Sequence, residues 1–331
     1  MKDDEAAALV REAYGLECDE VGFFIAAPLS AGDIAAFARS GSDMQYGEVL
    51  PAGMAAIARE LGVGGDCERL CELGSGTGKQ ALHLFLRHEN VLDVLAVELS
   101  RDRCDVCRRA WRRVAAAHPT RYALDEAHWA SASTFALTDG ARTLRCHAGD
   151  LLEDRWTEDV ARAQVLVLQT CFPPSIHEAL CRRVLLHAAP GARVVSYHAF
   201  ELLWTVDDEC PFSPLPCTVR GDKFPTSWQN EAGYAFSLYV RDGGRASGGL
   251  GVEPRRDGVD APPVDGAFRE GDLVWTRFAF WPVSGIGEDE WDPGVVLRAN
   301  PGGGCVVFYE ASGEVDYDVP AENIKARATT T

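Results

Sequence analysis

A loop of alternating glycines between a short apolar run and a helical pattern constrains the fold more than any other feature. Residues 72–78 read Glu-Leu-Gly-Ser-Gly-Thr-Gly, and the next apolar run ends at Glu98. Strand, glycine turn, helix and strand in this order predict a doubly wound α/β unit with a parallel sheet. The alternative is a glycine-rich turn in an α/β domain that binds no ligand there.

The same loop narrows the class of ligand. A dinucleotide fingerprint needs glycine at its sixth position, which Lys79 occupies. A phosphate-binding loop needs an earlier glycine and a hydroxyl after its lysine, but Leu73 and Gln80 hold these positions. Glycine backbone and a carboxylate at the next strand end suit an adenosine-bearing cofactor without phosphate. We therefore expect S-adenosyl-L-methionine.

The rest of the N-terminal two thirds alternates between helical and strand patterns. Short helical patterns cover 3–14 and 33–39, and a further helix is entered from Tyr46. An irregular insertion is expected at 118–140. Strand patterns cover 69–73, 91–98, a segment ending at Cys146, 164–170, 193–196, 215–219 and 233–240. We expect the last two to form an antiparallel edge of the sheet.

A glycine- and proline-rich stretch separates this part from four short strand patterns. They predict a small all-β barrel that looks like a Tudor-type module. The expected organisation is an N-terminal helical segment at 1–45, a catalytic domain at 46–240, a flexible linker at 241–264 and the barrel at 265–326. Aromatic residues of the barrel are candidates for a cage around a methylated ammonium group, or else core filling: Trp275, Phe278, Trp281, Trp291, Phe308 and Tyr309.

Composition bounds the partners. The chain has 331 residues and a net charge of −18, which argues against a surface that coats a polyanion. One predicted helix is nevertheless rich in arginine between 101 and 113. This helix is a candidate contact for nucleic acid or for an acidic patch. The alternative, which we favour, is a solvated helix face. The barrel is acidic, which suits a basic peptide ligand. No apolar stretch reaches the length that spans a membrane.

The eleven cysteines, in a chain that starts without a secretory pattern, are expected to be reduced thiols of an intracellular protein. A zinc site is conceivable from Cys67 and Cys71 with Cys104 and Cys107, but no histidine cluster completes it. Buried thiols are the alternative, and we expect no metal.

Several segments together resemble the disruptor-of-telomeric-silencing family of histone methyltransferases, which act on lysine 79 of histone H3. Between about residues 46 and 240, four motifs carry the resemblance: Tyr46-Gly-Glu-Val, the loop from Glu72 to Lys79, Val97-Glu98, and Gly149-Asp150-Leu-Leu. The resemblance implies a class I S-adenosylmethionine-dependent methyltransferase fold, a histone or nucleosome as partner, and a nuclear location. A cytoplasmic location would go with a non-histone acceptor.

The resemblance also implies roles for individual residues. Glu98 would bind the ribose hydroxyls, Asp150 the adenine amino group and Glu72 the methionine ammonium, although Glu72 and Asp150 are alternatively a strand-end charge and a turn residue. The remaining cofactor-binding candidates are Glu48, Gly74, Ser75, Gly76, Gly78, Lys79, Leu151 and Gln169.

The chain departs from the family at the site of methyl transfer. Where the family has Asn-Asn-Phe, this chain has Gln169-Thr-Cys-Phe172, and the family's tyrosine pair maps near Tyr234 and Phe236. The expected catalytic residues are Gln169 and Phe172, with Tyr46 and Trp228 as walls or, for Trp228, core filling. The alternatives to a histone methyltransferase are a methyltransferase with a non-histone or small-molecule acceptor, and a catalytically weak cofactor-binding reader of methyl-lysine.

Overall fold

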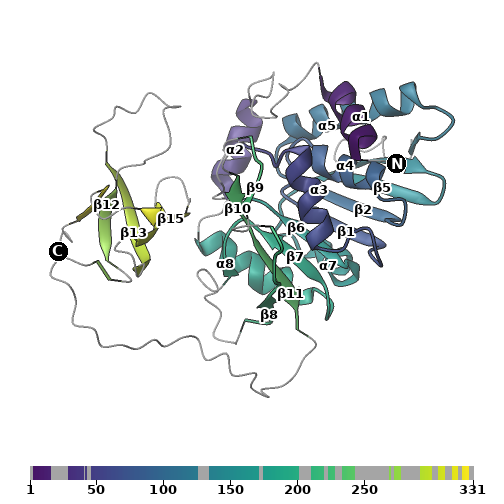
Figure 1. The fold of residues 1–331 in the computed structure, drawn as a ribbon. Coiled ribbons are helices and arrows are strands. Elements are labelled where there is room, and N and C mark those ends of the chain that lie inside the picture. Colours follow the sequence, from purple (N-terminus) through teal and green to yellow (C-terminus); the bar gives the residue numbers. More distant parts are fainter. Residues whose placement is uncertain are drawn as a thin grey trace. The chain divides into compact units, whose positions relative to one another are not determined.

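The computed structural model describes residues 3–15, 29–40, 42, 46–125, 134–170, 174–200, 210–219, 223–227, 233–242, 268–269, 272–276, 291–299, 305–309, 315–319 and 323–327. The chain forms two compact units (Figure 1). The first holds Met1–Thr170 and Ser175–Gly244, and the second holds Arg245–Thr331 together with Cys171–Pro174.

The first unit is built on a nine-stranded mixed sheet in the order β3-β4-β5-β2-β1-β6-β7-β11-β8. A separate two-stranded sheet pairs β9 with β10. The strands are β1 (Arg69–Leu73), β2 (Asp93–Glu98), β3 (Ala123–Asp125), β4 (Thr134–Asp139), β5 (Arg142–Ala148), β6 (Val165–Leu168), β7 (Arg193–Ser196), β8 (Phe212–Pro214), β9 (Lys223–Phe224), β10 (Tyr234–Ala235) and β11 (Ser237–Arg241).

The five central strands are parallel and confirm the predicted doubly wound sheet. Along β5-β2-β1-β6-β7 the chain order is third, second, first, fourth, fifth. The order reverses between β1 and β6, so this fold places its ligand crevice at the carboxyl ends of these two strands. Continuous burial of Val94–Val97 and Val165–Leu168 is what a sheet covered on both faces requires.

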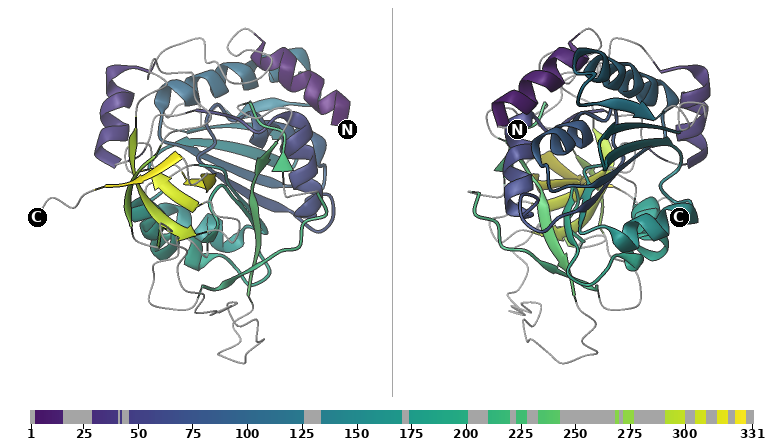
Figure 2. Two further views of the ribbon diagram at one scale, coloured as in Figure 1. Left: turned by 60° about the vertical axis from the view of Figure 1, so that its left-hand side comes forward. Right: turned by 90° about the vertical axis from the view of Figure 1, so that its right-hand side faces the viewer.

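Helices cover both faces of this sheet. In the first unit α1 packs on α4 and α5, and Figures 1 and 2 show these three on the side of the sheet opposite α7 and α8. The helices are α1 (Asp3–Tyr14), α2 (Ala31–Ser40), α3 (Pro51–Glu60), α4 (Lys79–Arg87), α5 (Arg101–Ala117), α7 (Thr157–Arg162) and α8 (Pro174–Arg183), with 3-10 turns η1 (Asp154–Trp156) and η2 (Leu185–His187). No helix in the described parts of the chain is long and apolar enough to span a membrane.

Three predictions of local structure were wrong. The expected irregular insertion contains β3 and β4, which extend the sheet beyond β5 in antiparallel fashion. The expected strand at 215–219 lies earlier, at β8, although Leu215 N–H still donates to Leu238 C=O. The helix expected from Tyr46 begins only at Pro51, because Val49 pairs with Thr226 and holds the preceding segment extended.

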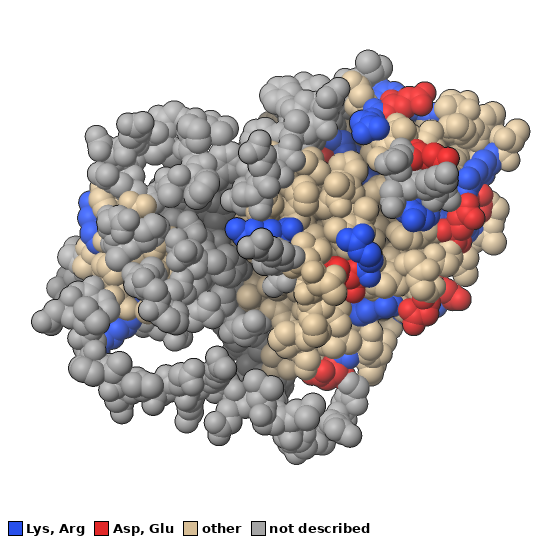
Figure 3. Space-filling model, in the orientation of Figure 1, with Lys and Arg blue, Asp and Glu red and all other residues tan. Residues whose placement is uncertain are grey.

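Charges of both signs are interspersed on the face of the first unit shown in Figure 3, as far as its residues are described. The arginine-rich helix is α5, and its arginines do not form one face. Arg103 is buried, Arg108 lies over the Phe135 ring, and Arg113 donates to Ala13 C=O, whereas Arg109 and Arg112 are exposed.

The second unit is a five-stranded antiparallel sheet in the order β15-β14-β13-β12-β16. Four of its strands match the predicted patterns and the fifth, β16, returns to pair with β12. Its small core consists of Val274, Val296, Cys305, Val307, Val319 and Ile324. The strands are β12 (Leu273–Thr276), β13 (Asp292–Ala299), β14 (Cys305–Tyr309), β15 (Val315–Val319) and β16 (Ile324–Ala326).

Candidate functional site

The glycine loop lies at the switch point, between the end of β1 and the start of α4. Gly74, Gly76 and Gly78 all have positive φ, at 83°, 55° and 73°. A Cβ at Gly74 would fall on Thr170 Oγ1, one at Gly76 would lie 2.6 Å from Tyr46 Cε2, and one at Gly78 would lie 2.5 Å from Cys107 Sγ. The glycines are therefore required both by backbone conformation and by the protein's own side chains.

Three buried carboxylates meet around this loop. Glu72 comes from β1, Glu98 from the end of β2, and Glu48 from the extended segment before α3. Their exposed fractions are 3%, 4% and 7%, respectively. Carboxylates this deeply buried need hydrogen bonds or cationic partners, so the partners of each define what the site can accept.

Glu98 is fixed by backbone donors. It accepts hydrogen bonds from the N–H groups of Gly76 (2.8 Å) and Ser100 (2.9 Å). Arg103 Nη1 lies 3.6 Å from its Oε1, and the Arg103 guanidinium lies between the rings of Phe37 (5.1 Å) and Tyr46 (4.8 Å). This arrangement holds an acceptor beside the glycine loop, at the position where an adenosine-binding fold uses a carboxylate for ribose.

Glu48 is the centre of a second network over the loop. It accepts from Thr77 Oγ1 (2.8 Å) and from the Tyr46 hydroxyl, and Lys79 Nζ lies 2.8 Å from its Oε2. The Glu48 N–H donates in turn to Ser227 Oγ at 3.0 Å. Tyr46, Glu48 and Lys79, three of the predicted site residues, are thus brought together as the cover of the glycine loop.

Glu72 differs from the other two carboxylates. Its Oε2 has no hydrogen-bond partner, and its Oε1 lies 3.3 Å from the Gln80 amide when that amide is turned to donate. Burial raises the pKa of Glu72 well above its ordinary value, Glu48 and Glu98 raise it further, and a hydrogen bond from the Ala81 backbone opposes the shift.

Two more polar atoms without a partner lie at the ends of the same strands. Gln169 follows β6, and its Nε2 has no partner, while its Oε1 is 2.5 Å from the reoriented Gln80 amide. Ser75 Oγ, in the loop itself, is also buried and without a partner. Unsatisfied polar atoms at one place in a fold call for a ligand.

Asp150 and Leu151 occupy the turn after β5, next to β2, since Ala148 pairs with Glu98. Asp150 Oδ1 accepts from Leu152 N–H at 2.9 Å, and its main-chain oxygen accepts from Trp156 Nε1 at 2.6 Å. Leu151 is 8% exposed. Asp150 therefore does serve as a turn residue, and the second oxygen of its carboxylate is not used by that turn.

Several predicted residues fall outside the described part of the structure. They are Phe172, Trp228, Phe278 and Trp281, and nothing is described of the Phe308 and Tyr309 side chains in β14. Among the described aromatics of the second unit, the Trp291 ring has Lys325 Nζ at 3.8 Å from its centroid, and the Trp275 ring has the Arg327 guanidinium at 5.3 Å. Both rings therefore already face a cation of their own unit.

Helix α2 was not predicted to be part of the site. Asp33, 3% exposed, accepts from the Ser100 hydroxyl and from the backbone N–H groups of Arg101 (3.1 Å) and Asp102 (2.9 Å). It thereby caps α5 next to Glu98. An aspartate in an alanine-rich helix gives no local signal of a contact with residues almost seventy positions away.

The cysteines do not assemble as the zinc alternative proposed. Cys104 Sγ lies 3.9 Å from Cys146 Sγ of β5 rather than beside Cys67 or Cys71. Burial raises the pKa of the Cys67 thiol to about 11. Among the described residues, no cluster of three or more His, Cys, Asp or Glu side chains could hold a metal ion.

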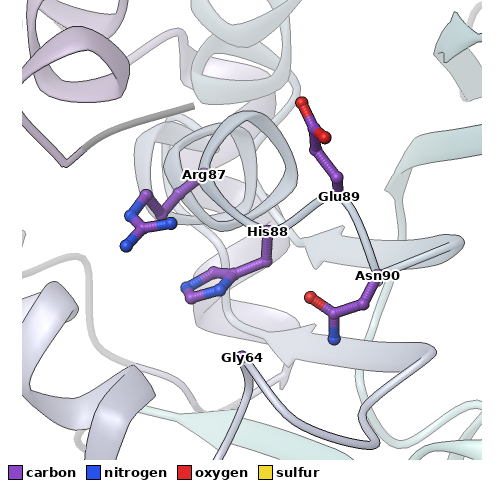
Figure 4. Close-up of a pocket in the computed structure, with 5 residues that line it drawn as sticks. All are labelled: Gly64, Arg87, His88, Glu89 and Asn90. Atoms are coloured by element: carbon purple, nitrogen blue, oxygen red, sulfur yellow. The ribbon is translucent and has the colours of Figure 1, made fainter.

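A shallow pocket of about 330 Å³ lies at the opposite edge of the sheet, where the chain enters β1 and β2 (Figure 4). Gly64 and His88 line it, and the Glu89 side chain points away from Gly64. Asn90 Nδ2 donates hydrogen bonds to the main-chain oxygens of Val63 and Cys67, both at 2.8 Å. This pocket shares no residue with the glycine-loop site.

Comparison with known proteins gives only weak likenesses to solved structures. No protein-family model and no curated protein matches the chain. Solved structures with which it aligns include an O-methyltransferase family protein from Burkholderia thailandensis (20% identity, TM-score 0.30, 43% of this chain and 36% of that one). A putative O-methyltransferase from Klebsiella pneumoniae aligns at 11% identity and TM-score 0.37 (66% and 92%). The glycopeptide N-methyltransferase MtfA complexed with sinefungin aligns at 18% and 0.30 (44% and 53%).

These structures are all methyltransferases by name, but the chain spans only about a third of the first and half of the third. Likenesses at such identities and scores carry no argument about activity. The α/β class follows from the sheet order of this chain itself. The chemistry must be argued from the glycine loop and its carboxylates.

Proposed function

We propose that the first unit is an S-adenosylmethionine-dependent methyltransferase. The observation that carries the proposal is the set of unsatisfied buried atoms at the switch point: Glu72 Oε2, Ser75 Oγ and Gln169 Nε2. A carboxylate, a hydroxyl and an amide complement the ammonium and carboxylate groups of a methionine moiety. The site therefore fits this cofactor, which would supply an electrophilic methyl group on its sulfonium.

Each residue then has a role that its surroundings permit. Glu72 binds the ammonium, Glu98 accepts from the ribose hydroxyls, and Asp150 offers its second oxygen to the adenine amino group. Gly74, Ser75 and Gly76 present backbone to the cofactor. Lys79 holds Glu48 in the cover of the loop, and Gly78 allows the turn with positive φ at the start of α4. The remaining contact is Leu151, whose buried side chain supplies an apolar wall.

The catalytic contribution of the chain is alignment and exclusion of water. Gln169 and Tyr46 lie next to the loop, and with Phe172 and Trp228 we expect them to form the wall around the acceptor. Water can take the proton of the acceptor's ammonium form before the reaction. The neutral amine then needs no general base, so the rate depends on orienting and desolvating the acceptor.

We further propose that the acceptor is a protein lysine, with histone H3 in nucleosomes as the first candidate and the nucleus as the location. The support is the ordered set of motifs in the sequence, from Tyr46-Gly-Glu to Gly149-Asp150. A non-histone protein or a small molecule is the second candidate, because Gln169 replaces the asparagine of the family beside the methyl-transfer site.

For the second unit we propose a Tudor-like barrel that binds methylated lysine in a basic peptide. A specific observation favours it: the Lys325 ammonium group lies over the Trp291 ring, with Nζ 3.8 Å from the ring centroid. Trp275 accepts a guanidinium in the same way. Both tryptophans are half-buried, and we propose that a methylated lysine takes the place of one of these cations.

Methyl transfer from labelled S-adenosylmethionine to nucleosomes, free histones and a buffer blank tests the proposal. Label on nucleosomal H3 that disappears with Glu98→Ala, and persists with the exposed control Glu89→Gln, is the expected result. Cofactor binding without label on any histone would overturn the histone acceptor and point to another one. Failure of the protein to bind the cofactor at all would overturn the methyltransferase.

A further inference from the structure

The three carboxylates of the site are not balanced in charge. Lys79 Nζ lies 2.8 Å from Glu48, and Arg103 Nη1 lies 3.6 Å from Glu98. Among the described residues, Glu72 has no such cation, and its Oε2 lacks even a hydrogen bond. Three buried acids thus share two internal cations, and the site is short of one positive charge when all three are ionised.

The other groups that face Glu72 do not supply this charge. From α4 these are the Gln80 amide and the Ala81 backbone N–H, and from the end of β6 the Gln169 amide. Glu48 and Glu98 add negative potential. The groups named here are two amides, a backbone N–H and two carboxylates, none of which is a cation, so a ligand must bring the missing charge.

We propose that this unbalanced set of carboxylates makes the site discriminate between the methyl donor and its demethylated product. The inference rests on the proposed function. S-adenosylmethionine carries one net positive charge, because its sulfonium adds to a balanced amino acid group, whereas S-adenosylhomocysteine is a thioether with no net charge. The two molecules otherwise offer the same hydrogen-bonding groups, so Glu98, Asp150 and the loop backbone bind both alike. The ammonium that Glu72 binds is also common to both, so the sulfonium charge alone distinguishes them, and the one net negative charge of the site favours entry of the donor and release of the product.

Dissociation constants of both molecules, measured by calorimetry on the full chain at pH 8, test this inference. A unit charge in a site of intermediate dielectric predicts that the donor binds about tenfold more tightly than the product. Glu72→Gln removes the unbalanced charge and should bring the two constants within about twofold. Lys79→Gln removes a compensating cation and should widen the ratio. The exposed Glu89→Gln, a matched loss of one charge elsewhere, should leave the ratio unchanged.

A steric preference would not respond with opposite sign to Glu72→Gln and Lys79→Gln. Equal affinities in the unaltered protein, or an unchanged ratio in Glu72→Gln, would overturn the inference while leaving the proposed function intact. Failure of both molecules to bind would overturn the proposed function instead. If the variants fold poorly, the unaltered protein still decides: the ratio should shrink as pH falls, since burial raises the pKa of Glu72 and protonation removes its charge.

Discussion

In the absence of a ligand, the folded protein disfavours the ionised form of the Glu72 side chain. Its pKa is raised in the folded protein by burial and by Glu48 and Glu98, so above its ordinary pKa the unfolded chain holds fewer protons than the folded one. The free energy of unfolding therefore falls as pH rises, by up to about 1.4 kcal/mol per pH unit for one proton. Glu72→Gln should remove this loss: the variant should match the unaltered protein only below the ordinary pKa of Glu72, at about pH 4, and exceed it in stability at pH 8. Urea denaturation at both pH values measures this, and parallel pH profiles would contradict it.

Gln169 carries the departure from the family at the proposed site of methyl transfer. Its longer arm brings the amide to Gln80, and Asn would withdraw it by about one bond length. We expect Gln169→Asn to lower methyl transfer by roughly tenfold to a hundredfold, because misplacement of about an ångström has this cost. The Kd of the cofactor, measured alongside, separates alignment from binding. Faster methyl transfer by Gln169→Asn would contradict this expectation and mean that glutamine at this position impairs activity.

At the scale of elements, the glycine loop joins two strand ends through packing as well as backbone conformation. Gly74→Ala would place a methyl group on Thr170 and should disrupt the ends of β1 and β6. Gly140→Ala is the matched control, since its φ is also positive, at 61°, but nothing lies within 4 Å. We expect the control to cost about 1 kcal/mol of unfolding free energy and Gly74→Ala about 3 kcal/mol or more. Thr170→Ala should partly restore Gly74→Ala; equal costs at the two glycines would refute the packing explanation.

Helix α2 acts on the site through α5. Asp33→Ala removes the acceptor for the Ser100 hydroxyl and for two backbone N–H groups at the start of α5. We expect a loss of about 2 kcal/mol in thermal or urea unfolding, together with weaker cofactor binding, because Ser100 N–H orients Glu98. Asp105→Ala, an exposed residue of α5 that pairs with Arg108, should change stability by less than about 0.5 kcal/mol. Full cofactor affinity in Asp33→Ala would contradict a link between α2 and the site.

The elements around the site were predictable where the pattern is local. The run at 69–73, the three glycines and the strand ending at Glu98 lie where the sequence placed them, because buried parallel strands and turns with positive φ have strong signatures. Strand β3 was missed because it has only three residues and forms an edge, and β4 because it follows a segment rich in alanine, serine and threonine. The Arg103–Phe37–Tyr46 stack and the Asp33 cap were not predictable, since they join segments that are distant in sequence.

For the whole molecule, the net charge of −18 is consistent with the acidic character of the proposed site. Charges of both signs are interspersed over the described residues on the face shown in Figure 3, and the excess of acidic residues belongs to the chain as a whole. Such a molecule favours a cationic ligand at long range as well as at contact.

The division into two units makes a last prediction about the molecule. All three buried carboxylates, the glycine loop and the nine-stranded sheet belong to the first unit. A fragment of residues 1–244 should therefore unfold cooperatively and bind S-adenosylmethionine within about twofold of the full chain. Calorimetry on both chains measures this, with Glu98→Gln in the fragment as the control that must weaken binding, since an amide cannot replace both acceptor oxygens. Loss of cofactor binding in a folded fragment would contradict this prediction and show that residues beyond 244 are needed for cofactor binding.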